Sequence, residues 1–143
     1  MVVVDAQDAI VGRLGAAVSK MLLAGKEVTI VNAEKALMKG SLLVAKEKYL
    51  SRRSQKDKRK PEHSPVWPRV PHLLLRRIIR GMLPWDSKRG REAYKRLKVV
   101  SSTPENLKGS AQKIPQTISP DKQGAFTLET LCRHLGYQGR RNL

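Results

Sequence analysis

The residues best suited to chemistry in this sequence are the lysines and arginines of residues 46–98. This stretch holds eighteen basic and five acidic side chains, and it carries thirteen of the seventeen net positive charges of the chain. Basic side chains bind phosphate groups, and the planar guanidinium of arginine also stacks on bases. The charges are interleaved with leucine, isoleucine, tryptophan and proline, which indicates an ordered surface. The clustering therefore predicts a polyanionic partner, in particular a nucleic acid.

The candidate contact residues come from an arm, from the two helices that follow it and from one arginine near the amino end. Two of them are tryptophans, whose rings can stack on bases, although either tryptophan could instead belong to the core. The candidates are Arg13, Arg52, Arg53, Lys56, Lys58, Arg59, Lys60, Trp67, Arg69, Arg76, Arg77, Arg80, Trp85, Lys88, Arg89, Arg91, Lys95, Arg96 and Lys98.

A row of three cations lies within this set. Lys88, Arg91 and Lys95 recur at intervals of three and four residues, so they line one face of a predicted helix. On the same helix, Ala93 and Leu97 can face a core. Like charges at this spacing repel each other, and bound phosphates would relieve the repulsion. A solvated helix face is the alternative explanation.

A second pattern, Gly12-Arg13-Leu14-Gly15, follows a predicted strand and opens a helix. Glycines in that position let backbone N–H groups approach a pyrophosphate, as in dinucleotide-binding proteins. The match is incomplete, because that motif needs three glycines directly after the strand and an acidic residue where this chain has Asn32. The segment could instead hold a nucleic-acid phosphate, or its glycines could allow close packing of the helix on the strand.

The remaining reactive side chains predict no active site. His63, His72 and His134 are far apart in the chain, and Cys132 has no partner at a spacing typical of metal ligands. The sequence contains no nucleophile motif and no paired carboxylates. We therefore expect no catalytic residue, no metal site and no cofactor, and we expect Cys132 to be a buried apolar residue of a helix.

The elements that position the basic residues begin with a strand–helix–strand unit. Short β-branched runs at residues 2–4 and 27–31 predict buried strands, and the apolar spacing of residues 11–22 predicts a helix between them that stops at Gly25. Such a unit places its two strands parallel. Residues 97–100 predict a third core strand. At 143 residues with 40% apolar content, the chain is sized for one domain, residues 1–143.

The basic residues themselves fall on an arm and on helices. Ser41 is the candidate N-cap of a helix that leads into the basic stretch, and four prolines keep residues 60–70 extended. These features predict a basic extended arm at about residues 51–71. Helical periodicity returns in three places. The predicted helices are residues 73–83, with Leu75, Ile78, Ile79 and Met82 on one face, residues 87–96, which Ser87 caps, and residues 126–137.

Three segments follow one another at a fixed spacing in the second half of the basic stretch. They are Arg80-Gly81-Met82-Leu83-Pro84, then Gly90-Arg91 after five residues, then Leu97-Lys98-Val99-Val100 after five more. This run resembles the signature of the universal large-subunit ribosomal protein L-thirteen family.

The resemblance covers nearly the whole chain. Residues 4–6 and 11–14 are similar to the amino end of the family, and residues 30–35 are similar to its second strand and turn. Residues 48–50, 69–71 and 135–137 are similar to its archaeal and eukaryotic branch. The chain departs from the family pattern in two places. Gly15-Ala16 stands where members often have Ala-Ser, and Trp85-Asp86-Ser87 stands where many have His-Lys-Thr.

The resemblance implies a three-layer α/β/α fold around a small, largely parallel, four-stranded sheet, with the basic arm as an extension. It implies a structural, non-enzymatic constituent of the large ribosomal subunit in the cytoplasm. Such a protein binds and stabilises large-subunit ribosomal RNA during assembly, and its other partners are neighbouring ribosomal proteins. Neither a membrane nor a second copy of the chain is expected as a partner.

Two other classes of function remain as alternatives. The glycines of residues 12–15 leave open a nucleotide-dependent enzyme. The basic amphipathic helix at residues 73–83 leaves open a protein that binds the surface of anionic membranes. The arm argues against a membrane-surface protein, because such a protein needs an exposed apolar face and this chain needs its apolar residues for one core.

Overall fold

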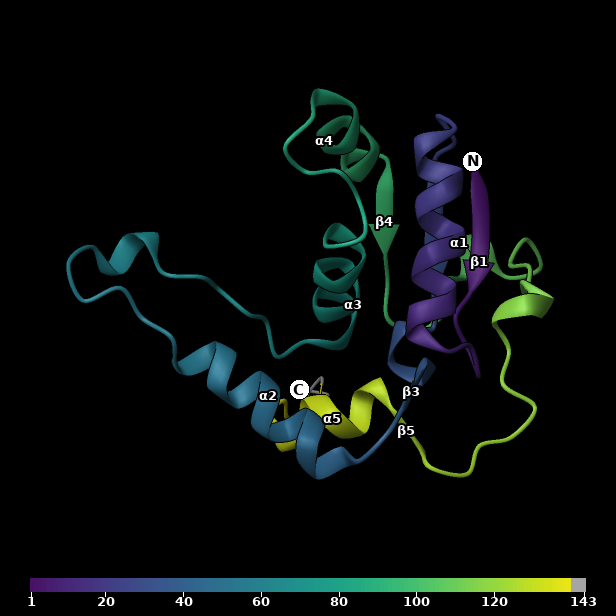
Figure 1. Ribbon diagram of the computed structural model, residues 1–143. Coiled ribbons are helices and arrows are strands. Elements are labelled where there is room, and N and C mark those ends of the chain that lie inside the picture. The colour runs from purple at the N-terminus through teal and green to yellow at the C-terminus, as the bar shows by residue number, and fades with distance from the viewer. Residues whose placement is uncertain (140–143) are drawn as a thin grey trace.

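The computed structural model describes residues 1–139 and shows helices packed around a small sheet, with an arm that projects to one side (Figure 1). The strands are β1 (Val2–Asp5), β2 (Val28–Val31), β3 (Leu37–Lys39), β4 (Leu97–Val99) and β5 (Ala125–Thr127). The helices are α1 (Val11–Leu23), α2 (Leu42–Ser54), α3 (Pro71–Arg80), α4 (Lys88–Lys95) and α5 (Leu128–His134).

The amino-terminal unit has the predicted strand–helix–strand order. β1 and β2 run parallel, with Val2 opposite Val28 and Asp5 opposite Val31, and β4 pairs in parallel with the other edge of β2. α1 connects β1 to β2, and its apolar stripe is fully buried in the core. The members of that stripe are Val11, Leu14, Val18 and Leu22. The predicted α/β class and the parallel pairing are confirmed.

The number of strands in the sheet differs from the predicted four. In the described part of the chain, the parallel sheet has three strands in the order β1-β2-β4, and β3 and β5 form a separate antiparallel pair. The chain leaves the parallel sheet after β2 because Asn32 adopts a φ of 55° and a 3-10 turn follows at Ala33–Lys35. Gln112 adds a single bridge to β1 on the edge away from β2. The pairing does not extend into a strand, because 3-10 turns at Glu105–Leu107 and Pro115–Thr117 lie on either side of Gln112. The three-layer α/β/α arrangement holds with this smaller sheet.

The arm is shorter and less extended than predicted. α2 continues to Ser54, so Arg52 and Arg53 are helical, and Pro61–His63 forms a 3-10 turn within the stretch expected to be extended. Proline is compatible with the first position of such a turn because the N–H that it lacks has no partner there. We call residues 55–70 the basic arm.

The tip of the basic arm folds back on itself through polar contacts. The carboxylate of Asp57 accepts hydrogen bonds from the backbone N–H groups of Arg59 and Lys60, at 2.9 and 3.4 Å. The hydroxyl of Ser64 accepts a further hydrogen bond from the N–H of Asp57, at 2.9 Å. These local bonds compete with extended backbone and explain the turn.

α3 is shifted toward the amino end relative to the predicted helix. It begins at Pro71, which supplies the fixed φ of a first helical residue, and it ends at Arg80. Its buried apolar residues include Leu75 and Ile79, as predicted, whereas Ile78 is half-buried. Met82 lies beyond the helix and is 39% exposed, so it is not part of the buried face.

α5 is shorter than the predicted helix because Phe126 belongs to β5, which pairs with β3. Its buried side includes Leu128, Leu131 and Cys132, which confirms the predicted apolar face. Burial raises the pKa of Cys132 to about 12, so its thiol stays protonated at neutral pH. The prediction of a buried apolar cysteine is confirmed.

Candidate nucleic-acid interface

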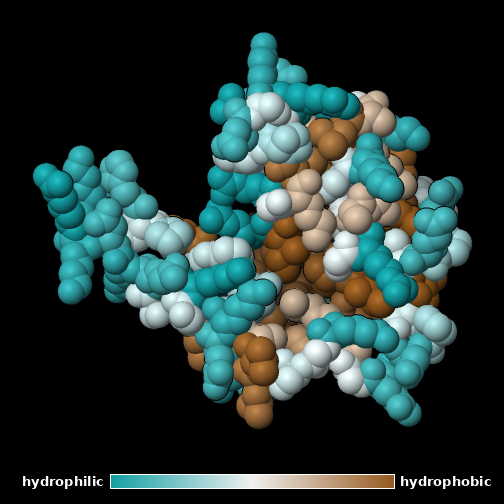
Figure 2. Space-filling view, viewed as in Figure 1, coloured by the Kyte–Doolittle hydropathy of each residue, from teal (hydrophilic) through white to brown (hydrophobic). Residues whose placement is uncertain are grey.

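The basic stretch forms three neighbouring structural parts: the end of α2 with α3, the basic arm, and α4. Figure 2 shows hydrophilic side chains over the projecting arm and over α4, with apolar side chains exposed between them. The three parts are held together by aromatic rings, because four arginines place their guanidinium groups over tryptophan or tyrosine side chains.

Trp67 is the first of these ring centres, and it joins α2 to α3. The guanidinium carbon of Arg52 lies 4.7 Å from its centroid, and that of Arg77 lies 5.0 Å away. Tyr49 packs edge-on against the same ring at 5.9 Å, and Arg52 also lies over Tyr49. Cation–π contacts of this kind limit the rotamers of the arginines while their N–H donors remain available.

A second ring centre joins α3 to α4. Arg80 lies over Trp85 at 4.0 Å, and Arg76 lies over Tyr94 at 4.6 Å. Trp85 and Tyr94 pack edge to face, with centroids 5.2 Å apart and ring planes at 84°. Trp85 is in the loop before α4 and Tyr94 is on α4, so the ring pair joins this loop to α4. Arg76 and Arg80 then join both rings to α3.

We call Arg52, Arg53, Arg76, Arg77 and Arg80 the anchored arginine surface. Within residues 1–139, none of these five guanidinium groups lies within 4.0 Å of a carboxylate. Partial burial, and then the charge of Arg69, lower the pKa of Arg53 from its ordinary value. An arginine remains charged at neutral pH even so, and the surface therefore keeps its full positive charge.

Neither Trp67 nor Trp85 is a bare stacking platform, and Trp67 packs against the edge of the core. Both are half-buried, and each ring already has at least one guanidinium over it. A base that approaches a covered face of either ring would meet a guanidinium group with an indole behind it. The guanidinium plane is itself a surface on which bases stack.

The basic arm carries its cations without such contacts. Lys56, Lys58, Arg59 and Lys60 are exposed, and no carboxylate lies within 4.0 Å of their charged groups in the described part of the chain. At the root of the arm, Arg53 donates a hydrogen bond of 2.6 Å to the carbonyl oxygen of Trp67.

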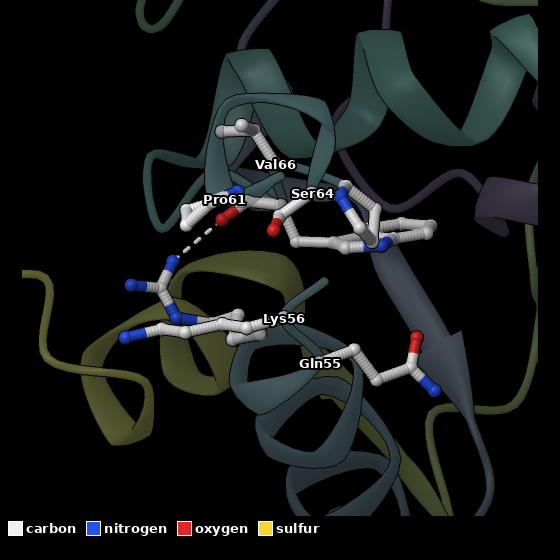
Figure 3. A pocket seen from close by; sticks show the side chains of 8 residues that line it. Gln55, Lys56, Pro61, Ser64 and Val66 are labelled. Carbon is white, nitrogen blue, oxygen red and sulfur yellow. Dashed lines mark hydrogen bonds between the residues drawn. The ribbon is translucent and has the colours of Figure 1, made fainter. Parts of the chain in front are cut away.

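The dashed line in Figure 3 marks this bond, which closes the arm over a hollow of about 330 Å³. Polar and proline side chains of the arm line the hollow together with Val66. Arg69, at the returning end of the arm, lies beside Gly136, where an added Cβ would come within 3.1 Å of its Nη1. The arm is therefore attached to the body at both of its ends.

α4 presents the predicted row of cations. The hydroxyl of Ser87 accepts a hydrogen bond of 3.2 Å from the N–H of Gly90, which confirms the predicted N-cap. Lys88, Arg91 and Lys95 are exposed, while Ala93 is fully buried beneath the helix. Lys88 lies 3.9 Å from the carboxylate of Glu92, an exposed pair that is worth little to stability.

Three further candidates occupy different environments. Arg89 and Arg96 donate hydrogen bonds of 3.2 and 3.0 Å to the carbonyl oxygens of Leu23 and Leu22, at the carboxyl end of α1. These bonds satisfy helix-end carbonyls and complement the helix dipole, so both guanidinium groups serve the fold. Lys98 is exposed on β4.

Arg13 lies apart from the other candidates. It lines a hollow of about 440 Å³ between α1 and the segment near Gln116, together with Lys20. Gly15, two positions further along α1, faces the side of the helix that packs near α3, because an added Cβ there would come within 2.6 Å of the Met82 sulfur. Residues two apart on a helix point in nearly opposite directions. Arg13 therefore faces away from α3.

The same contact decides between the explanations for the glycine pattern of α1. Gly15 allows close approach, as the packing explanation requires, but the neighbour is Met82 after α3 and not a strand. Gly12 has open space around its Cα, with no atom within 4 Å of an added Cβ. Both glycines lie inside α1, and neither belongs to a loop that cradles a phosphate.

Sequence reasoning did not identify Tyr49, Tyr94 and Asp86 as parts of this interface. The two tyrosines hold arginines in place, and Asp86 lines a hollow with Arg77 and Arg80. The available signal was composition: within a chain that is 4% aromatic, Tyr49, Trp67, Trp85 and Tyr94 all fall in the basic stretch. Aromatic residues interleaved with arginines at this density favour cation–π pairs.

Metal sites and membrane spans are absent from residues 1–139. No group of three or more His, Cys, Asp or Glu side chains is placed to hold a metal ion. No helix of this part of the chain has both the length and the apolar character to cross a membrane.

Fold and surface together define an α/β protein that displays a broad set of arginines and lysines, which is typical of nucleic-acid-binding proteins. The family model for Ribosomal protein L13 matches residues 1–106. The chain belongs to this family.

Individual members are similar over most of their length. The chain is 38% identical to the large ribosomal subunit protein uL13 of Methanopyrus kandleri, in a match that covers 95% of this chain and 87% of that protein. It is 39% identical to the protein of the same name from Archaeoglobus fulgidus, over 96% and 88% of the two chains. The uL13 protein of Methanocaldococcus jannaschii is 41% identical, over 95% and 98%.

Proposed function

We propose that this protein is a structural constituent of the large ribosomal subunit, and not an enzyme, and that it binds and stabilises large-subunit ribosomal RNA during assembly. The observation that carries the proposal is the anchored arginine surface, in which four guanidinium groups lie over aromatic rings without a carboxylate partner in the described residues. Membership of the ribosomal protein L13 family supports it. The comparisons give no support to a nucleotide-dependent enzyme or to a membrane-surface protein.

The mechanism follows from the number and placement of the cations. RNA segments that approach one another repel through their phosphates, and lysine and arginine contacts replace that repulsion with attraction. Contacts to the backbone fix position and orientation without reading a long sequence, so we expect recognition of RNA shape. One domain, residues 1–143, would carry the anchored arginine surface, the α4 row and the basic arm, and the arm would reach between RNA segments.

The candidate contacts do not all have the same part in this mechanism. We assign phosphate binding to the anchored arginine surface, to the exposed lysines and Arg59 of the arm, and to Lys88, Arg91 and Lys95. Arg89 and Arg96 contribute charge but are committed to the end of α1. Arg13 would meet a different RNA segment, because it faces away from α3.

The proposal also covers partners other than RNA. We expect contacts with neighbouring proteins of the large subunit in the cytoplasm, and we expect the chain to act as a single copy. Native mass spectrometry of the purified protein and chemical crosslinking in ribosomes would test these two expectations separately.

The proposed function is tested by the salt dependence of binding to a large-subunit ribosomal RNA fragment. The logarithm of the affinity should fall with the logarithm of the salt concentration, with a slope of several units, because each neutralised phosphate contributes roughly 0.7 to 0.9. A flat response would overturn the proposal. Charge reversal at Arg91 and Lys95 should weaken binding more than charge reversal at Lys20 and Lys26 on and after α1, and equal losses would show that the assigned surface is wrong.

A further inference from the structure

One hollow of the interface has features that backbone binding does not require. Its volume is about 400 Å³, and it lies between the end of the basic arm, α3 and the loop that leads into α4. It is lined in part by Trp67, Arg77, Arg80, Leu83, Trp85 and Asp86. Pockets for small ligands start at roughly 300 Å³, so this hollow has room for one nucleotide but not for a helix.

The walls of the hollow are suited to a flat aromatic ligand. Arg80 lies over Trp85 at 4.0 Å and Arg77 lies over Trp67 at 5.0 Å, so each side offers a guanidinium plane with an indole beside it. Tyr94 packs edge to face with Trp85, and Leu83, which also lines the hollow, is buried. RNA-binding proteins hold unpaired bases on such aromatic and arginine planes.

Asp86 is the feature that a surface for phosphates alone does not explain. A carboxylate repels phosphate, yet Asp86 lies in the same hollow as Arg77 and Arg80. Asp86 is an exposed residue, and within residues 1–139 its side chain has neither a hydrogen bond nor an ion pair with them or with any other described group. The carboxylate is therefore available as an acceptor of hydrogen bonds.

The chemistry of a carboxylate selects among the four bases. Its two oxygens accept two adjacent donors, and it has no proton to donate at neutral pH. Guanine presents two neighbouring donors on its Watson–Crick edge, the N1–H and the 2-amino group. Adenine and cytosine each place one amino donor beside an acceptor, and uracil has one N–H between two carbonyls. A carboxylate that reads the Watson–Crick edge thus favours guanine.

We propose that this hollow binds one unpaired guanine of the RNA, which stacks on the arginine and tryptophan planes and donates two hydrogen bonds to Asp86. The proposal rests on the proposed RNA-binding function and adds a base-specific contact to it. Arg77 and Arg80 would also neutralise the phosphates on either side of the extruded nucleotide. The interface would then read one base directly and the remaining RNA by shape.

The test uses the full-length protein and short single-stranded oligouridylates that differ only in their central nucleotide. Affinity is measured by fluorescence anisotropy, and quenching of tryptophan emission reports stacking. The oligonucleotide with a central guanosine should bind roughly tenfold more tightly than those with adenosine, cytidine or uridine. Inosine, which keeps the N1–H but lacks the 2-amino group, should lose most of this preference. Equal binding of guanosine and inosine, or preference for another base, overturns the proposal.

Two substitutions locate the effect on the protein. Asp86→Asn should abolish the guanosine preference, and Glu92→Gln, which removes an exposed carboxylate of α4 outside the hollow, should leave it intact. Trp85→Ala should weaken the binding of all four oligonucleotides by about tenfold, since stacking does not depend on the base. A guanosine preference that survives Asp86→Asn overturns the assignment.

The guanine site and the proposed function can be overturned separately. If the ribosomal RNA fragment binds with a steep salt dependence but the oligonucleotides show no base preference, the guanine site is wrong and the proposed function stands. If the fragment itself does not bind, both fall. Thermal unfolding of each variant shows whether a loss of binding reflects a loss of fold.

Discussion

The anchored arginine surface and the basic arm carry the same sign of charge in two different ways. On the surface, guanidinium groups lie 4.0 to 5.5 Å from aromatic centroids and are partly buried. On the arm, Lys56, Lys58, Arg59 and Lys60 are exposed side chains. The bonds that shape the arm tip use backbone N–H groups and Asp57. One region therefore holds its cations in place, and the other holds only the backbone that bears them.

This difference separates geometric fit from electrostatic attraction. A long basic side chain loses rotamer freedom when it binds, at a cost of up to about 2 kcal/mol. Cation–π contacts limit that freedom before RNA arrives. The arginines of the anchored arginine surface therefore lose less side-chain entropy when they bind RNA. The lysines of the arm keep their freedom and attract phosphates over distance, which salt screens. We infer that the surface determines how RNA docks and that the arm increases how fast and how tightly it associates.

The sharpest test of this comparison removes two cations from each region. Arg77→Ala with Arg80→Ala should weaken binding to a large-subunit ribosomal RNA fragment by about 3 kcal/mol, because charge-assisted hydrogen bonds and their stacked geometry are both lost. Lys58→Ala with Arg59→Ala should cost about 1 kcal/mol, since exposed charges are well solvated. The arm pair is a matched control, because the hydrogen bond to Asp57 at the arm tip comes from the backbone N–H of Arg59 and does not need the Arg59 side chain.

Filter binding at low and high salt measures both effects. The loss from the arm pair should shrink as salt increases, and most of the loss from the surface pair should remain, because partly buried charges are screened less. Equal losses with equal salt dependence would contradict the division between the two regions.

A second prediction concerns the packing on which the surface depends. Gly90→Ala should lower the free energy of unfolding by about 2 kcal/mol, because the added Cβ would collide with the carbonyl of Pro84 in the loop that carries Trp85. Gly12→Ala is the control, since Gly12 lies in a helix with open space around its Cα. This variant should raise the free energy of unfolding by about 1 kcal/mol. Urea denaturation measures both. Unchanged stability of Gly90→Ala would show that the loop is not fixed by this contact.

The third and smallest effect is expected at the root of the arm. Arg53→Ala removes the 2.6 Å hydrogen bond to the carbonyl of Trp67, so the arm should sample more conformations and RNA binding should weaken by about 1 kcal/mol. A glutamate-specific protease should then cut faster at the exposed Glu62 near the tip. Lys56→Ala, which removes a neighbouring cation without this bond, should leave the cleavage rate unchanged. Identical rates for both variants would mean that Arg53 does not hold the arm.

The elements of this fold that were predictable from the sequence are those with a long local pattern. The apolar spacing of α1 and the N-cap at Ser87 were both correct. Strands β3 and β5 were missed because, unlike residues 97–100, they carry no run of β-branched residues, and each exists by pairing with the other. The arm was predicted too extended, because the proline pattern does not reveal that Asp57 and Ser64 close the tip.

The candidate interface divides in the same way. The charge of residues 46–98 and the exposed row on α4 were predictable, because they depend on counting and on helical period. The hydrogen bond from Arg96 to the carbonyl of Leu22 at the end of α1 was not predictable, because the two residues are 74 positions apart in the chain. The position of Trp67 among the basic residues was predictable, but the two arginines over its ring were not, and its contact with bases stays a prediction.

By itself, the sequence determined where the charge lies, which segments are helical and that the first two strands run parallel, because these follow from composition and from patterns within a few residues. Only the tertiary structure decided which arginines lie over Tyr49, Trp67, Trp85 and Tyr94, and that Asp86 shares a hollow with Arg77 and Arg80. The physical reason is that these contacts join residues on different elements, and packing of the apolar core sets the distances between those elements. The sequence therefore specified a basic surface, and the fold made part of it rigid.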